Sequence, residues 1–304
     1  MRIAVVGEAL TDCVKPFDSS EVVEVPGGSP MNVAIGLGRL GVDVLLAARW
    51  GPDSRGQAIA DHVGSSKVAV IDAASGMEKT STATAVIQED GSAEYVFDLT
   101  WDLTPEMVHS GGFTHVHTGS IGATLEPGAG SAWEVADRER QAGASVSYDP
   151  NARPQIMGTP SDALPRVEAM IDISDVVKAS DEDLEWFYPG VPLEDVVANW
   201  HARGVSLVVI TRGKDGLLGF SHTATVSLPT RATGVVDTIG AGDSVMSGLI
   251  SALADRSLLG VENATQLAHL DEHSLTEILG FALDCAAVTV SRAGANPPWL
   301  TEIK

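Results

Sequence analysis

The chain of 304 residues has little of several things that whole classes of protein require. It holds only two cysteines, Cys13 and Cys285, far apart in unlike contexts, so we expect a reduced, cytoplasmic protein rather than a disulfide-stabilised secreted one. We find no apolar run near the roughly 18 residues that span a bilayer. The N-terminal residues 1–8 are typical of a short strand that ends at an acid, not of a signal peptide.

Positive charge is also scarce, since 19 Lys and Arg stand against 41 Asp and Glu, for a formal net charge of −22. Nucleic-acid backbones and anionic lipid surfaces attract proteins that carry clusters of Lys and Arg, so neither is an expected partner. An anionic nucleotide can still bind where main-chain amides, Mg²⁺ and a few local cations supply the positive field.

Two familiar nucleotide motifs are absent or misplaced. A phosphate-binding P-loop is excluded because Gly213-Lys214 is followed by Asp215, and Val208 stands where its first glycine belongs. The glycines of segment 36–41 match G-x-G-x-x-G, but they fall late in a helix predicted to begin near Asn32. A dinucleotide site needs them directly after a strand, so close helix–sheet packing is the better interpretation.

What the sequence does contain is a regular alternation of strand and helix patterns. Strands are predicted at 3–7, 44–48, 68–71, 113–118, 144–149, 175–178, 205–210 and within 226–236. Helices are predicted at 31–40, 57–63, 129–142, 161–172, 192–203, 243–255 and 275–290. Such alternation predicts an α/β fold with a mostly parallel sheet covered on both faces, here as a single domain over 1–304.

Two antiparallel segments, 10–25 and 82–98, interrupt this alternation. The second has a hairpin pattern around an Asp90-Gly91 turn. Together they are candidates for a small lid, which a phosphoryl-transfer enzyme needs to exclude water. The edge strand of a lid also invites a homodimer through sheet pairing.

The most informative stretch is Asp237-Thr-Ile-Gly-Ala-Gly-Asp243, which leads into a helix rich in small residues. The glycines allow a tight turn and close approach to a ligand, and the helix start offers unpaired N–H groups to an anion. Asp243 would repel a phosphate, but it suits a general base that takes a proton from an attacking hydroxyl. An N-cap Asp after an ordinary glycine-rich turn is the alternative.

Other candidates lie at strand ends and helix starts. Segment 27–32 brings a glycine pair and Asn32 to a helix start, which suits a polyhydroxylated ligand or merely forms a Pro–Gly turn. Asp149-Pro-Asn-Ala-Arg153 closes a strand and is more typical of a site than of a turn. His115 and His117 share one side of a strand, where a hydrogen-bonded structural role is favoured over a metal. Lys178, Arg212 and Lys214 follow strand ends, where open α/β sheets bind ligands, although lone cations there are usually surface residues.

Taken in order, these motifs resemble the ribokinase-like (PfkB) carbohydrate kinases across nearly the whole chain, and the fructokinase branch most closely. The matching segments are Gly7-Glu8-x-x-x-Asp12, Gly27-Gly28-x-x-x-Asn32, Asp149-x-Asn151-x-Arg153, Val208 to Gly216, Asp237 to Asp243, and Ala286-Ala287 with Arg292-x-Gly294.

The resemblance implies a doubly wound sheet with a β lid, a requirement for ATP and Mg²⁺, and transfer of the γ-phosphoryl group to a sugar hydroxyl. Asp243 would be the base, with the amides of Gly240, Ala241 and Gly242 as the anion hole. The remaining implied contacts are the sugar with Asp12, Gly28, Asn32 and Arg153; the nucleotide with Lys178, Thr211, Gly213, Gly216 and Gly294; and K⁺ beside Asp237 and Ile239.

Two departures leave alternatives open. Ser180 and Asp183 stand where the family usually shows Asn-x-x-Glu, so Mg²⁺ handling could rely on water or on Glu182. Segment 99–102 of the lid carries no recognisable motif, which leaves the sugar in doubt. A fructokinase-like sugar kinase is the leading hypothesis. A 2-keto-3-deoxygluconate, ribose or nucleoside kinase is the alternative within the class, and a sugar-binding protein that lost catalysis is the alternative outside it.

Overall fold

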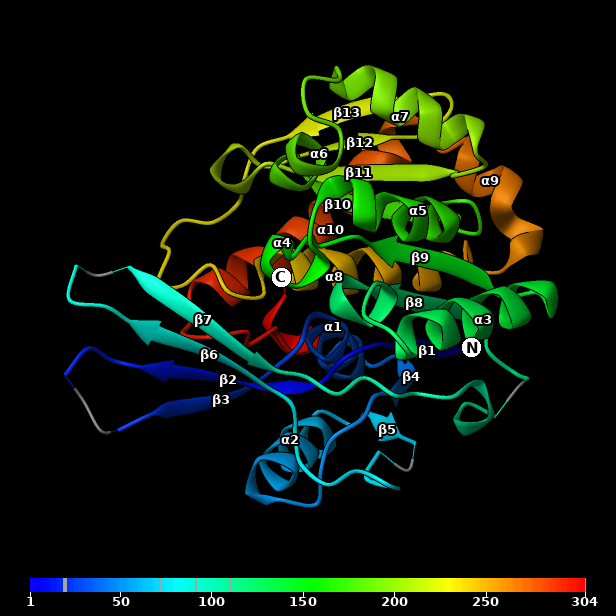
Figure 1. The fold of residues 1–304 in the computed structure, drawn as a ribbon. Helices are drawn as coiled ribbons and strands as arrows, with labels where there is room; N and C mark the ends of the chain where they lie inside the picture. Colours follow the sequence, from blue (N-terminus) through cyan, green and yellow to red (C-terminus); the bar gives the residue numbers. More distant parts are fainter. Residues whose placement is uncertain (19–20, 72, 91, 110, 304) are drawn as a thin grey trace.

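The computed structural model describes residues 1–18, 21–71, 73–90, 92–109 and 111–303 (Figure 1). Its main sheet has nine strands in the order β13-β12-β11-β10-β9-β8-β1-β4-β5. Their bounds are β1 Arg2–Val6, β4 Asp43–Ala47, β5 Ala69–Val70, β8 His115–Gly119, β9 Ser145–Asp149, β10 Val176–Ser180, β11 Leu207–Thr211, β12 Leu217–Phe220 and β13 Thr225–Leu228.

The strand pairing confirms a mostly parallel, doubly wound sheet. All neighbours from β5 to β11 pair in parallel, and only β12 and β13 are antiparallel additions at one edge. The expectation of strands across 226–236 is wrong beyond Leu228, since no strand follows among the described residues up to 240. Exposed Val235 and Val236 produced the apolar pattern there, and the Val236 amide instead donates to the carbonyl of Val290.

Helices cover both faces of this sheet (Figure 1). Helices α1 Ser29–Arg39, α8 Ala241–Asp255 and α10 Glu272–Val290 pack on one face, and α3 Gly128–Gln141, α5 Pro160–Ile171 and α7 Leu193–Ala202 on the other. The remaining helices are α2 Ser54–Ser65, α4 Pro154–Met157, α6 Asp181–Phe187 and α9 Ala264–Ala268, with 3-10 turns at Pro105–Met107, Ser120–Ala123, Gly213–Asp215, Val261–Asn263 and Leu300–Glu302.

Helix α10 is long and apolar enough to cross a membrane by composition alone. More than half of its most apolar window, 56%, is buried inside the protein, and α10 packs against α8 and β13. Its apolar character is therefore accounted for by core packing.

A second sheet projects from the main body in the order β3-β2-β6-β7 (Figure 1). Its strands are β2 Leu10–Lys15, β3 Val23–Gly27, β6 Thr82–Ile87 and β7 Ala93–Asp98. The two segments that broke the α/β alternation thus form one sheet, which we call the lid. Gly91 of the predicted turn lies outside the described residues. Strands β2 and β6 pair in parallel, which joins the two antiparallel hairpins.

The glycines of segment 36–41 pack helix α1, as expected. A Cβ at Gly36 would collide with the Ser247 hydroxyl on α8, and one at Gly38 with the Ser66 carbonyl. Small residues are needed there because the backbones approach closely.

The strand histidines lie inside the core. His115 contacts Ser145 and Ser147 through its two ring nitrogens, at 2.7 and 2.8 Å, and His117 contacts Ser147 at 2.9 Å. Within the described ranges no three His, Cys, Asp or Glu side chains are arranged to hold a metal ion.

Candidate active site

A cleft of about 730 Å³ opens where the parallel strands end, under the lid. The strand order reverses beside β1, and β1, β8, β9 and β10 all send their carboxyl ends to this side. Open α/β sheets bind ligands at such a switch point. The residues that line the cleft include Glu8, Asp12, Gly28, Ser29, Asn32, Ser120, Asp149, Asn151, Arg153, Lys178 and residues 238–243.

Helix α8 brings Asp243 to the base of this cleft. Gly240 precedes the helix with φ of 75°, in the left-handed region that favours glycine, and a Cβ there would lie 2.6 Å from the Cβ of Ala295. The turn therefore requires glycine for its conformation and for its space. It places Asp243 in the first helical turn, facing the cleft.

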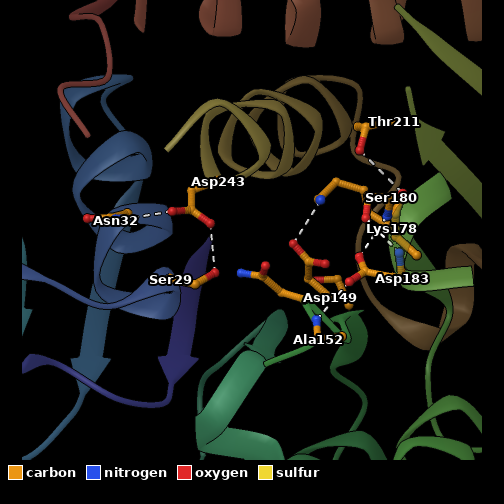
Figure 2. A network of polar contacts seen from close by, with 12 residues as sticks. Ser29, Asn32, Asp149, Ala152, Lys178, Ser180, Asp183, Thr211 and Asp243 are labelled. Carbon is orange, nitrogen blue, oxygen red and sulfur yellow. Dashed lines mark hydrogen bonds and ion pairs between the residues drawn. The ribbon is translucent and has the colours of Figure 1, made fainter. Parts of the chain in front are cut away.

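Both carboxylate oxygens of Asp243 accept hydrogen bonds from helix α1 (Figure 2). Ser29 Oγ donates to Oδ1 at 2.7 Å, and Asn32 Nδ2 donates to Oδ2 at 2.8 Å. Burial raises the pKa of Asp243 above its ordinary value, opposed by these two hydrogen bonds and by the charges of Lys178 and Arg153. The result is a buried carboxylate held in one orientation, with lone pairs still free for a hydroxyl proton.

Not all of the main-chain amides beside Asp243 are available to bind an anion. The Ala241 amide donates to the Thr238 carbonyl at 3.2 Å, so it is engaged in the turn rather than free as expected. Among the described residues, no acceptor is found for the amides of Gly240, Gly242 and Asp243. These three unpaired donors at a helix N-terminus can hold an anion.

A cation lies next to these amides. Lys178 Nζ forms a buried ion pair with Asp149 Oδ2 at 2.9 Å and lies 3.4 Å from where a Gly242 Cβ would stand. Burial alone would lower the pKa of Lys178, but the carboxylates of Asp149, Asp183 and Asp243 raise it overall. Lys178 is therefore protonated. It lies in the middle of β10 rather than after a strand end as expected, because the strand continues to Ser180, and it is buried and lines the cleft, where a surface position was the alternative.

Ser180 and Asp183 have a structural role that their sequence did not reveal (Figure 2). Ser180 Oγ accepts from the Asp183 amide at 3.0 Å, and Asp183 Oδ2 accepts from the Ser180 amide at 2.8 Å, a reciprocal cap on α6. Asp183 Oδ1 also accepts from the Ala152 amide at 2.7 Å. Asp183 thus ties the loop after β9, which carries Arg153, to the end of β10.

The expected sugar contacts gather on the lid side of the cleft. A Cβ at Gly27 would collide with the Asp12 carboxylate, and Gly28 has φ of 117°. The Asn32 amide nitrogen is engaged by Asp243, and its Oδ1 is buried without a hydrogen-bond partner among the described residues. Arg153 Nη1 donates to Asn151 Oδ1 at 2.7 Å, and its side chain is exposed in the cleft.

Asp12 is open to the solvent of the cleft, yet protein surrounds much of it. This burial raises its pKa to about 6, and nearby Arg153 lowers it while Asp243 raises it further. Asp12 is therefore largely ionised near neutral pH and can accept sugar hydroxyls.

Of the five expected nucleotide residues, Lys178 lines this cavity and the other four lie apart from it. Thr211, Gly213, Gly216 and Gly294 do not line it, and Thr211 Oγ1 donates to the Ala179 carbonyl at 3.4 Å. Asp237 accepts from the Ile239 amide at 3.0 Å and from the Gly294 amide at 2.8 Å, so its carboxylate braces the loop before α8. Ile239 is exposed and lines the cleft.

Several residues that line the cleft were not identified as site residues from the sequence. Ser29 was hidden because its partner Asp243 lies 214 positions away, although its place beside Gly28 could have drawn attention. Glu8 stood in a quoted motif but was given no role. Tyr95 and Phe97 stood in the predicted hairpin of 82–98 but were given no role, and Ser120 follows a predicted strand without a recognisable motif.

The donor set fits a nucleotide with its metal. The unpaired amides and the Lys178 ammonium, which lies 3.4 Å from where a Gly242 Cβ would stand, suit the terminal phosphates of ATP. Mg²⁺ is usually held by one or two carboxylates, waters and the substrate phosphates, so no closed protein cage is needed. The exposed Glu182 is free for such a role more readily than Asp183, whose oxygens are both engaged.

Comparison with known proteins identifies the family. The model of the pfkB family carbohydrate kinases matches residues 1–302. The fructokinase of Rhizobium leguminosarum bv. trifolii is 32% identical over 282 residues, which cover 88% of this chain and 84% of the relative. Probable fructokinase-3 of Arabidopsis thaliana is 30% identical over 318 residues, 98% of this chain and 88% of that protein. The crystal structure of the Xylella fastidiosa fructokinase with bound ATP superposes with a TM-score of 0.89 at 25% identity, covering 99% and 96% of the two chains. This chain therefore belongs to the pfkB family of carbohydrate kinases, with the ribokinase-like fold, and is a fructokinase-like phosphotransferase.

Proposed function

We propose that the protein is an ATP-dependent kinase of a neutral sugar, with fructose as the first candidate. The observation that carries this proposal is the Asp243 carboxylate, held by Ser29 and Asn32 beside unpaired amides at the floor of the cleft. The curated fructokinases that resemble this chain support the choice of sugar.

In the proposed reaction, the sugar lies between the lid and α8. Asp12, Gly28 and Asn32 hold its hydroxyls, and Arg153 contacts the sugar or the transferred phosphate. Asp243 accepts the proton of the attacking hydroxyl, while Ser29 and Asn32 keep its carboxylate oriented. ATP bound with Mg²⁺ supplies the terminal phosphoryl group. The amides of Gly240, Gly242 and Asp243 stabilise the charge on the transferred group, with Ala241 joining if its bond to Thr238 opens.

The nucleotide is proposed to extend from this point along the ends of β10 and β11. Lys178 lies closest to the transferred group, and Thr211, Gly213, Gly216 and Gly294 would line the rest of the nucleotide site. A K⁺ ion is proposed to lie beside Asp237 and Ile239, where it would stabilise the loop before α8. The Asp237 carboxylate already holds this loop by accepting hydrogen bonds from the Ile239 and Gly294 amides.

At the level of the whole chain, we propose one domain over 1–304 whose lid closes on the sugar. A homodimer through the lid is also proposed, because β3 and β7 are the outer strands of the lid sheet and, among the described residues, each leaves one edge unpaired. A cytoplasmic location is consistent with two free, buried cysteines.

Charge favours a neutral acceptor over a sugar acid. Four carboxyl groups line the cleft, those of Glu8, Asp12, Asp149 and Asp243. Lys178 compensates Asp149, and Arg153 is then outnumbered by the remaining acids, so a carboxylated sugar is disfavoured. A panel of fructose, ribose, 2-keto-3-deoxygluconate and a nucleoside, with ATP consumption as readout, tests this preference.

The decisive test of the mechanism is Asp243→Asn. The variant is expected to fold and bind ATP and sugar, and to lose about 10²- to 10⁴-fold in kcat because the proton acceptor is gone. Asp271→Asn, at the exposed N-cap of α10, is the matched control and should retain kcat. Near-normal turnover of Asp243→Asn would refute the assignment of the base. Binding of both ligands by the unmodified protein without any product would favour a sugar-binding protein that lost catalysis.

A further inference from the structure

One cation in the cleft lies among acids and yet pairs with none of them. Arg153, in the loop after β9, lines the cleft together with Glu8, Asp12 and Asp243. Burial raises the pKa of these three acids, and the nearby charge of Arg153 lowers each of them in part. In the described part of the chain, however, no carboxylate forms an ion pair or a hydrogen bond with the Arg153 guanidinium group. Its position is therefore not set by charge alone.

The loop that carries Arg153 holds it through its own oxygens. Arg153 Nη1 donates to Asn151 Oδ1 at 2.7 Å, to the Ala152 carbonyl at 2.9 Å and to the Asn151 carbonyl at 3.2 Å. Three acceptors thus share the two hydrogens of one nitrogen. Over the described ranges Nε and Nη2 have no acceptor, and because the side chain is exposed in the cleft, these donors are available to a ligand.

The backbone of this loop is fixed and carries a conformational cost. Asn151 has a φ of 39°, in the left-handed region, which asparagine adopts more readily than most residues other than glycine. The Ala152 amide donates to Asp183 Oδ1 at 2.7 Å, so the next residue is anchored to the start of α6. Residues in such backbone conformations are frequent at functional sites, where the surrounding structure maintains them. The contact that this conformation gives Asn151 is the one with Arg153.

The hydrogen bonds within the loop compete with ion pairs across the cleft. A hydrogen bond from a charged donor and an ion pair at a partly exposed site contribute similar amounts of free energy, so a single bond can decide where Arg153 lies. The bond to Asn151 Oδ1 is the shortest of the three and is made by a side chain. An ion pair with Asp243 would occupy a lone pair that the proposed base needs, and an ion pair with Asp12 would compete with the sugar hydroxyls.

We propose that Asn151 is a positioning residue, which holds the Arg153 guanidinium group away from Asp12 and Asp243 and keeps Nε and Nη2 free for the transferred phosphoryl group. This inference rests on the proposed function, because that function assigns Asp243 as the base and Asp12 to the sugar. Asn151 acts through Arg153 and leaves both carboxylates available to the sugar. The anionic phosphoryl group then meets two unoccupied donors on a cation that is already oriented.

The Asn151→Gly substitution tests the proposal. Glycine suits the left-handed backbone, so the variant is expected to fold, and the loss of Oδ1 should let Arg153 turn toward Asp12 or Asp243. KM for fructose should rise about tenfold and kcat should fall about tenfold, the effect of one such contact. The low-pH limb of kcat/KM should move to lower pH, because a closer cation lowers the pKa of an essential carboxyl group. A purely structural role for Asn151 would lower activity without moving this limb.

Further variants show whether Asn151 acts through Arg153. In an Arg153→Gln background, which lacks the cation, Asn151→Gly should change KM and kcat by less than about twofold. Asn151→Asp keeps an acceptor and tolerates the same backbone conformation, so KM for fructose should stay within about twofold of the unmodified protein. The control is Asn199→Ala on α7, which removes a comparable bond from Arg203 Nε to Asn199 Oδ1 at 3.1 Å and should leave the kinetics unchanged.

A measurement without turnover follows the same effect. Carbon-13 NMR of protein labelled at the aspartate carboxyl carbons reports the ionisation of Asp12 and Asp243, assigned with Asp12→Asn and Asp243→Asn. In the unmodified protein the pKa of Asp12 is expected at about 6 and that of Asp243 above its ordinary value. Asn151→Gly should lower the pKa of at least one of them by about one pH unit or more, and this change should vanish in the Arg153→Gln background. The other groups that act on Asp243 are the same in all of these variants, namely Ser29, Asn32 and Lys178.

The outcomes separate this inference from the proposed function. If the unmodified protein phosphorylates no sugar, the proposed function fails, and the NMR titrations still decide the role of Asn151. If Asn151→Gly leaves both titrations unchanged, or has the same effect with and without the Arg153 cation, the inference is overturned. A rise in KM for Asn151→Asp as large as that for Asn151→Gly would also overturn it, because the acceptor for Arg153 is then present.

Discussion

The Glu8→Gln substitution tests whether the buried carboxyl group of Glu8 has a raised pKa and makes the stability of the protein depend on pH. Glu8 follows β1, is 7% exposed, and accepts a hydrogen bond from the Gly122 amide through Oε2 at 2.7 Å. Burial raises its pKa from 4.5 to about 7, against the opposing effects of the Glu8 and Gly122 amides, Arg153 and Ser120. Glutamine has the same shape and can still accept from Gly122, so the substitution removes mainly the charge.

The sign and size of the effect follow from this pKa. The folded protein holds the Glu8 proton more tightly than the unfolded chain, so its contribution to stability is complete below pH 4.5 and is lost as pH rises through about 7. At 1.36 kcal/mol for each pKa unit, the shift corresponds to about 3 kcal/mol. As the pH rises from 5 to 8, the unmodified protein should lose this contribution while Glu8→Gln does not. The stability of Glu8→Gln minus that of the unmodified protein should therefore increase by about 2–3 kcal/mol over this range.

Urea unfolding of both proteins at a series of pH values measures this change directly. Asp12 also has a raised pKa and shifts stability in the same direction, but it is present in both proteins and cancels in the difference. Glu185→Gln, at an exposed glutamate on α6, is the control and should show no such trend. A difference between Glu8→Gln and the unmodified protein that stays constant within about 0.5 kcal/mol over this range would refute the reasoning.

Two further substitutions test the turn and the loop that hold the site. Gly240→Ala should cost about 1–3 kcal/mol of stability and lower kcat, because the left-handed backbone and Ala295 leave no room for a Cβ, whereas Gly234→Ala, with open space around it, should be close to neutral. Thermal unfolding and steady-state kinetics check both, and equal effects would contradict the argument. Asp183→Asn should cost about 1–2 kcal/mol, because one oxygen is lost from a carboxylate that caps α6 and binds the Ala152 amide. Urea midpoints check it against the exposed Asp181→Asn, and a loss of similar size in that control would show that the loop tie contributes nothing.

The sequence predicts well what depends on local backbone chemistry. The position of α8 and the turn at Gly240 follow from glycine spacing and a helix start, and both hold in the structure. Central strands such as β11 were predicted because buried apolar runs are a local signal. The site residues themselves were predicted largely through resemblance to a family, since no local pattern connects Asp12 with Asp243.

The predictions that were wrong or missing have one physical cause: the structure at those positions depends on residues that are distant in the sequence. Val235 and Val236 carry the residue types of a strand, yet they are 62% and 68% exposed, because β13 is the last strand of the main sheet on that side in the described part of the chain. The role of Asp183 depends on the Ala152 amide, 31 positions earlier, which the fold brings against the start of α6. Such contacts are set by strand order, and residue type alone does not reveal them.

The strongly acidic composition and the proposed binding of a nucleotide are compatible because of how the positive field is built. Lys178, a buried cation at the cleft, is paired with Asp149, so much of its charge is already compensated. The unpaired amides of Gly240, Gly242 and Asp243 supply the rest as fixed dipoles. Fixed dipoles depend on backbone geometry rather than on the number of Lys and Arg residues, and they are screened little by salt because they lie at the base of a cleft. We therefore expect phosphate recognition in this chain to depend on the glycines that shape the turn, and a net charge of −22 does not oppose it.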